Sequence, residues 1–190
     1  MKNSKYINMV TTLLAFGLIG GCGTMPQENT RSTTGTQPAS GGKTDISAIG
    51  GELLKTEGIG PLKRALSADE TVKILGNPET KSKASVWPAD GLEHQDWIYK
   101  QKGLTLDMIT EGGKQEVGNM TASAPCKFKT KRGVGIGTNA QTVMNAYKAE
   151  INLSASDSSQ SLIIGTVYEG IVFSMKDARV SSIFFGASAE

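Results

Sequence analysis

The feature that most constrains this chain is an apolar run near its N-terminus that ends at Cys22. Lys2 and Lys5 precede the run, and two glycines stand directly before the cysteine. A positively charged start, an apolar core and small residues before a cut are typical of a secretory signal peptide. The run is too short and too polar for a comfortable transmembrane helix. Residues 1–21 are therefore predicted to be a signal peptide, and the fold has to be built without them.

The segment Ile19-Gly20-Gly21-Cys22 resembles the lipobox of bacterial lipoproteins. That resemblance implies cleavage just before Cys22, a diacylglycerol on its sulfur, and an acyl chain such as palmitate on its new amino group. Because stable anchoring takes at least two chains, the lipid on Cys22 is predicted to hold the mature protein on a membrane. Gly23 replaces the Asp that favours inner-membrane retention in such lipoproteins, which indicates the periplasmic face of the outer membrane. The alternative is a cleaved soluble export signal with a chance cysteine.

The composition after removal of the signal peptide bears on nucleic-acid binding and on the state of Cys126. The chain has 20 basic and 18 acidic residues, and residues 1–21 contain two lysines and no acid, so 18 of each remain. This balance lacks the basic excess of a nucleic-acid-binding surface, so no nucleic-acid partner is predicted. If Cys22 is lipidated, Cys126 has no partner within the chain. It is predicted to be a small buried apolar residue, with a reactive or intermolecular thiol as the alternative.

Two segments precede the region with regular strand patterns. Residues 22–45 consist mostly of Gly, Ser, Thr, Pro and Gln, which predicts a disordered, lipidated linker. Residues 46–58 carry apolar residues at positions i, i+3 and i+7, which predicts a short helix, although two consecutive glycines weaken it.

The rest of the chain shows one pattern twice. Residues 67–70, Ser-Ala-Asp-Glu, are a capping box, and residues 138–141, Thr-Asn-Ala-Gln, repeat it 71 positions later. Apolar residues at helical spacing and then alternating strands follow each box. The predicted fold class is α+β, with two tandem helix-plus-antiparallel-sheet repeats over residues 59–124 and 125–190 whose sheets join or pack. Chance similarity of two small halves is the alternative.

The first repeat carries a set of motif residues: Leu66-Ser67, Glu70-Thr71-Val72, Leu75-Gly76-Asn77-Pro78 and Trp97-Ile98-Tyr99. These motifs resemble the BamE (SmpA/OmlA) family of small outer-membrane lipoproteins. The second repeat is similar but lacks Leu-Gly-x-Pro, and the tandem arrangement is similar to the β-lactamase-inhibitor-protein architecture. The resemblance implies a fold and protein binding rather than a chemistry. Because this chain has two units, it departs from the single-unit lipoprotein of the assembly machinery.

No residue pattern points to catalysis, a cofactor or a metal. His94 is the only histidine, and its polar surroundings predict an exposed loop position. With one histidine and one remaining thiol, no zinc site of standard spacing can be drawn. Trp87 lies near a predicted loop, where it is either an interface anchor or the end of a strand that closes the core. Trp87 and His94 are therefore the candidate interface residues. The remaining strand aromatics are predicted to be core: Trp97, Tyr99, Tyr168 and Phe173.

Three classes of function remain open. The leading interpretation is a non-enzymatic, membrane-tethered protein-binding or scaffolding module of the cell envelope, with envelope assembly as the candidate process. The competing interpretation is a proteinaceous inhibitor of a periplasmic hydrolase. An envelope enzyme ranks last, because paired carboxylates meet only in space and the sequence singles out no pair.

Overall fold

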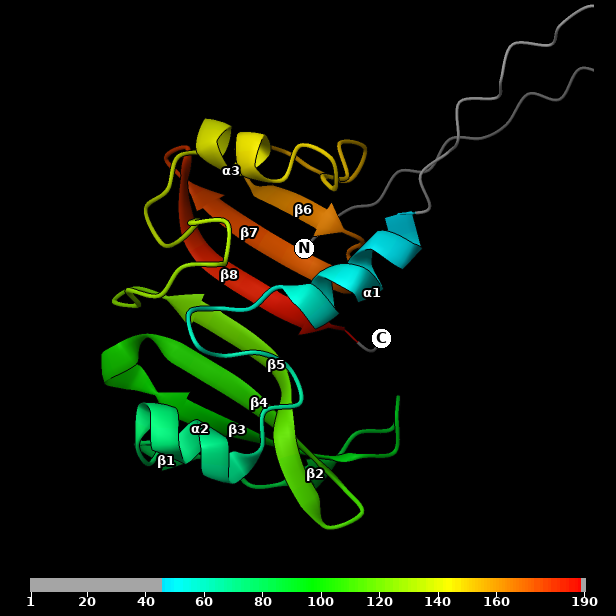
Figure 1. Cartoon of the computed structure of the whole chain (residues 1–190), viewed down its shortest axis with the longest axis vertical. Helices are drawn as coiled ribbons and strands as arrows, with labels where there is room; N and C mark the ends of the chain where they lie inside the picture. The colour runs from blue at the N-terminus through cyan, green and yellow to red at the C-terminus, as the bar shows by residue number, and fades with distance from the viewer. Residues whose placement is uncertain (1–45, 189–190) are drawn as a thin grey trace, which may run out of the picture. The chain divides into compact units, whose positions relative to one another are not determined.

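A computed structural model describes residues 46–188, which form a mixed α/β fold dominated by strands (Figure 1). The predicted α+β class is confirmed. The helices are α1 (Ile46–Thr56), α2 (Ala68–Leu75) and α3 (Ala140–Ala146), with a short 3-10 helix at Lys100–Lys102. The strands are β1 (Thr80–Lys81), β2 (Ser85–Val86), β3 (Glu93–Tyr99), β4 (Leu104–Glu111), β5 (Lys114–Ser123), β6 (Ser161–Gly165), β7 (Glu169–Lys176) and β8 (Arg179–Ala187).

All eight strands belong to one antiparallel sheet, in the order β1-β3-β4-β5-β8-β7-β6, with β2 also paired to β3. One half of the sheet, β1 to β5, follows α2 in the chain, and the other half, β6 to β8, follows α3. The halves join where β5 pairs with β8 over only four residues on each strand, from Met120 to Ser123 on β5. Residues 114–119 of β5 therefore extend beyond this pairing.

The two faces of the sheet differ sharply in exposure. Successive side chains of a strand point to opposite faces. One set of alternate side chains forms a fully buried row across six strands, and we call this side the covered face. Its central row is Tyr99, Leu104, Ala122, Ile183, Phe173 and Leu162. Helix α1 contacts β6 and β7, α2 contacts β5, and α3 contacts β6. The opposite side, the open face, carries mostly half-buried or exposed side chains, so within residues 46–188 no helix covers it.

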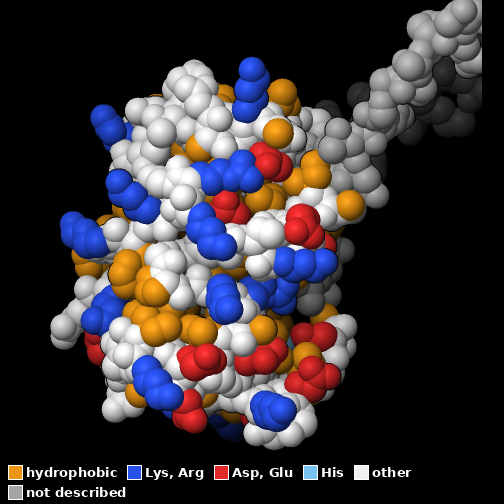
Figure 2. Space-filling model, viewed as in Figure 1, with side chains coloured by type: hydrophobic (Ala, Val, Ile, Leu, Met, Phe, Trp, Pro, Cys, Tyr) orange, Lys and Arg blue, Asp and Glu red, His pale blue; other side chains and the backbone are white. Residues whose placement is uncertain are grey.

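Figure 2 shows the side of the molecule on which the helices lie. Basic, acidic and apolar side chains are intermixed over this surface, and no single kind dominates it. The helices thus present an ordinary mixed surface to solvent while their inner sides pack on the sheet.

Helix α1 shows why two consecutive glycines stand inside a helix. A Cβ atom at Gly50 would lie 2.2 Å from the backbone oxygen of Glu169, at the start of β7. Only glycine permits this close approach of helix and strand. Gly50 is therefore what lets α1 pack closely on the sheet, whereas a Cβ atom at Gly51 would lie 3.4 Å from the Glu169 carboxylate, an ordinary contact distance.

The two predicted capping boxes have different outcomes. Ser67 is the N-cap of α2, its side chain accepts from the Glu70 N–H, and the Glu70 side chain accepts from the Ser67 N–H, so the first box is confirmed. The second box is wrong. Asn139, one residue later than predicted, caps α3 by accepting from the Thr142 N–H at 2.8 Å. An asparagine side chain reaches this donor as well as a threonine does, and the Thr138 hydroxyl instead accepts from the Gly135 N–H.

The aromatic predictions hold with one exception. Trp97, Tyr99 and Phe173 are buried, as predicted. Tyr168 is 51% exposed and lies in the turn between β6 and β7, so its assignment to the core is wrong. The strand before this turn is β6, an apolar segment that the sequence pattern did not reveal. The pattern also did not reveal the two-residue strands β1 and β2.

Cys126 is buried and unpaired, and burial raises the pKa of its thiol. Both observations agree with its predicted role as a small apolar residue. Within residues 46–188, no helix has the length and apolar character needed to cross a membrane.

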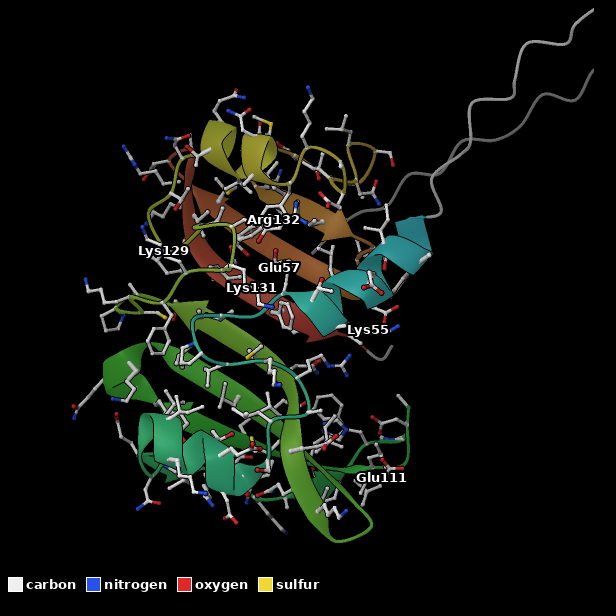
Figure 3. All side chains as sticks on the ribbon, in the orientation of Figure 1. Lys55, Glu57, Glu111, Lys129, Lys131 and Arg132 are labelled. Carbon is white, nitrogen blue, oxygen red and sulfur yellow. The ribbon has the colours of Figure 1, made fainter. Side chains whose placement is uncertain are left out.

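A charged cluster ties three distant segments together on the covered side (Figure 3). Arg132 donates from Nε to Glu57 at 3.0 Å and from Nη2 to Glu150 at 2.7 Å. Its guanidinium also lies 4.6 Å from the centre of the buried Tyr147 ring. Glu57 is only 4% exposed, so Arg132 compensates a charge that water barely reaches. This cluster is a structural clamp between the segment after α1, the segment before α3 and the loop after α3.

Candidate functional site

The open face carries a row of apolar and threonine side chains that runs across the sheet without interruption. We call it the open row: Ile98, Thr105, Thr121, Phe184, Val172 and Ile163, each directly paired with the next. Ile163 at the edge is buried, Thr121 is exposed, and the other four are half-buried. An apolar strip that stays accessible on a folded domain is typical of an interaction surface.

Small polar side chains flank the open row on one side. Ser123, Ser182, Ser174 and Ser161 form a parallel row of hydroxyls across four strands. All four are half-buried or exposed. Apolar side chains and uncharged hydroxyls beside them can give a partner both apolar contact and hydrogen bonds without the cost of burying charge.

A charged network lies on the other side of the open row. His94 on β3 places its Nδ1 2.9 Å from Oδ1 of Asp107 on β4, and its Nε2 3.0 Å from Oδ2 of Asp90. Asn119 on β5 donates to Asp107 at 3.0 Å. The same amide accepts from the Ala187 N–H of β8 at 2.9 Å, so the network crosses from one half of the sheet to the other.

Trp87 stands over this network. Its ring stacks on the His94 ring with centroids 3.8 Å apart and an angle of 3° between the planes. His94 is only 4% exposed, while Trp87 is 37% exposed. Because His94 lies on the open face, Trp87 forms a wall at one end of that face. An exposed, rigidly held tryptophan beside an apolar strip is the kind of residue that anchors protein interfaces.

The pKa values of the two carboxylates in the network are shifted in opposite directions. Burial raises the pKa of Asp107, with the neighbouring Asp96 charge adding to the effect and His94 and Asn119 opposing it. The backbone N–H of Leu92, helped by His94, holds the pKa of Asp90 below its usual value. A neutral imidazole can donate from only one ring nitrogen, so a neutral His94 can donate to only one of the two carboxylates.

This arrangement favours a structural and recognition role for His94 over a catalytic one. Both ring nitrogens face carboxylate oxygens, so neither is free to take a proton from a hydroxyl or thiol. Among the described residues, no group of three His, Cys, Asp or Glu side chains is placed to hold a metal ion. The network pins the Trp87 turn to the sheet.

The sequence-predicted site residues have different outcomes. Trp87 and His94 are brought into direct contact, although nothing in the sequence indicated their stacking. The prediction that His94 lies in an exposed loop is wrong, because strand β3 and the stacked Trp87 bury it. The lipid-attachment residue Cys22 lies outside the described residues, so its lipidation stays a prediction.

Sequence reasoning missed the partners of His94 and the open row. Asp107 stood between Leu106 and Met108, and a lone acid inside an apolar strand was a usable signal of a buried contact. The runs Ile171-Val172-Phe173 and Ile183-Phe184-Phe185 were a second signal. In a strand of period two, the middle residue of such a run points away from the core.

Comparison of the chain with protein-family models, with curated proteins and with solved structures finds no match. The proposed function therefore rests on the geometry of the site and on the sequence.

Proposed function

We propose that this chain is a lipid-anchored protein of the bacterial outer membrane whose folded part binds another protein in the periplasm. The observation that carries the proposal is the open face, where the open row of apolar and threonine side chains lies between a row of serines and the wall formed by Trp87. Burial of such a row against a partner gains apolar contact area that the isolated chain leaves in water. A scaffolding role in envelope assembly fits this surface.

The anchor is the second part of the proposal, and it rests on residues 19–22 of the sequence. Cells that express the full chain are grown with radiolabelled palmitate, and Cys22→Ala is compared with Cys126→Ala. We expect label on the wild type and on Cys126→Ala, and none on Cys22→Ala. Label that persists on Cys22→Ala would contradict the lipoprotein assignment.

The tandem arrangement is a third part. Each half of the sheet contains three long antiparallel strands after a capped helix, and the first half adds the two-residue strands β1 and β2. The last strands of the halves, β5 and β8, pair with each other. This common order supports two copies of one unit, similar to the BamE-like repeat. Two such units side by side double the width of the open face.

The protein-binding test compares two solvent-accessible apolar side chains, half-buried Phe184 on the open face and exposed Ile74 on α2. Phe184→Ala removes the largest side chain of the open row, and Ile74→Ala removes an exposed side chain of α2. After chemical crosslinking of membranes, we expect Phe184→Ala to lose its partner and Ile74→Ala to retain it. Equal capture by the two variants would contradict binding through the open face. A captured hydrolase whose activity falls in the complex would instead identify an inhibitor.

A further inference from the structure

Two cavities meet at one arginine between the halves of the sheet. The larger, of about 600 Å³, is lined by residues of α1, of the loop after it and of β5. The smaller, of about 230 Å³, lies against Trp87 and His94 at the end of the open face. Arg64 and Ile109 line both cavities. Arg64 thus stands where the crevice beside β5 reaches the Trp87 wall.

The Arg64 guanidinium is held in place but has unused donors. Its Nε donates to the Gly118 carbonyl oxygen at 2.7 Å. Beside it, the backbones of Ala65 and Val117 are joined by an N–H···O bond of 2.8 Å, which fixes the loop that carries Arg64. Within residues 46–188, the side chain forms no other hydrogen bond and no ion pair. Both Nη groups are therefore available, in the forked geometry that suits a carboxylate.

The surrounding side chains favour an anion with an apolar group attached. The larger cavity holds three basic side chains, Lys55, Lys63 and Arg64, against the acids Glu116 and Glu169. Asp90, in the smaller cavity, is already bonded to the Leu92 N–H and to His94. Trp87, Ile109 and Ala187 supply apolar walls to that cavity. Its volume suits one side chain.

We propose that Arg64 binds the C-terminal carboxylate of a protein partner, with the apolar side chain of the last residue against Trp87 and Ile109. A chain terminus carries its carboxylate and its side chain on the same Cα, which matches the closeness of Arg64 to the apolar wall. The choice of a protein as the source of the carboxylate rests on the proposed function, whereas the carboxylate site itself does not.

The test uses the purified full chain in detergent and two probes that differ in one group, the carboxylate of N-acetyl-leucine and the uncharged carboxamide of N-acetyl-leucinamide. Calorimetry and tryptophan fluorescence follow each titration. We expect the acid to bind with a Kd on the order of 1 mM and the amide not to bind. Arg64→Gln should weaken binding of the acid about 10- to 100-fold, and Arg64→Lys, which keeps the charge without the fork, should fall between. The matched control Lys63→Gln should change it less than about fivefold.

Several results would overturn the site. These are equal binding of acid and amide, no binding of either probe, an unchanged Kd in Arg64→Gln, and displacement of the acid by an equal concentration of inorganic phosphate. Circular dichroism of each variant checks that it is folded. If Arg64→Gln does not fold, Arg64→Lys still tests the site. Loss of this site with an intact Phe184-dependent partner would leave the proposed function standing, and probe binding without any partner would leave the site standing.

Discussion

The two faces of the sheet use the same strands for opposite purposes. Phe173 on β7 is fully buried on the covered face, whereas its neighbour Val172 is half-buried on the open face. On β8, Ile183 and Phe184 show the same contrast. These two strands therefore carry apolar side chains on both sides, but helices cover only one side. Apolar residues on a face without a helix are what a binding surface requires and what a stable monomer alone does not.

The largest effect should come from the covered face. Phe173→Ala removes a ring with no exposed surface and should lower the free energy of unfolding by about 3–5 kcal/mol. Phe184→Ala should cost about 1 kcal/mol, because solvent already reaches this ring. Urea unfolding of the two variants checks the comparison. Equal losses would mean that the two faces do not differ as described.

The charged clamp on the covered side should behave like the core beside it. Arg132→Ala leaves the buried carboxylate of Glu57 without its cation and should cost about 3–5 kcal/mol. Lys55→Ala, which breaks only the exposed pair with Glu52, is the control and should cost less than about 1 kcal/mol. Thermal and urea unfolding give both values. A loss in Arg132→Ala as small as in the control would show that water solvates Glu57.

Substitution of Trp87 tests whether the open face contributes to partner binding. Trp87→Ala should weaken partner binding by about 2 kcal/mol or more, as expected for an interface anchor. Trp87→Phe, which keeps an aromatic ring over His94, should recover part of the affinity. Partner capture and the intensity of the crosslinked band measure both. Undiminished capture by Trp87→Ala would remove Trp87 from the interface.

The pH dependence of stability should have opposite signs on the two sides. Hydrogen bonds from Arg132 hold the pKa of Glu150 below its usual value, so its stabilising contribution is present above the ordinary carboxyl pKa and is lost as pH falls through the lowered one. Burial raises the pKa of Asp107, so stability falls as pH rises from the ordinary value through the raised one. Each slope is at most about 1.4 kcal/mol per pH unit.

Unfolding measured between acid and neutral pH tests these signs. Glu150→Gln should flatten the loss of stability on the acid side, and Asp107→Asn should flatten the decline that accompanies rising pH. The slopes are compared, because each substitution also shifts the absolute stability. A steeper curve in either variant would contradict the assigned direction of its pKa.

Local patterns predicted much of the fold. The Ser67 capping box, the alternating strands of the first half and the buried Trp97 and Tyr99 all follow from neighbours in the sequence. The site depends instead on cross-strand register, which the sequence does not display. His94 is buried only because Asp107 comes from the next strand and Trp87 folds back over its ring. The prediction of the second cap was wrong because two adjacent residues, Thr138 and Asn139, can both cap a helix.

The most direct test of the open face is site-specific photocrosslinking in living cells. A photoreactive amino acid replaces Thr121, the exposed centre of the open row, or Lys73, an exposed position on α2. We expect illumination to give a defined protein adduct from position 121 and none from position 73. Adducts from position 73 alone, or from neither position, would contradict protein binding through the open face.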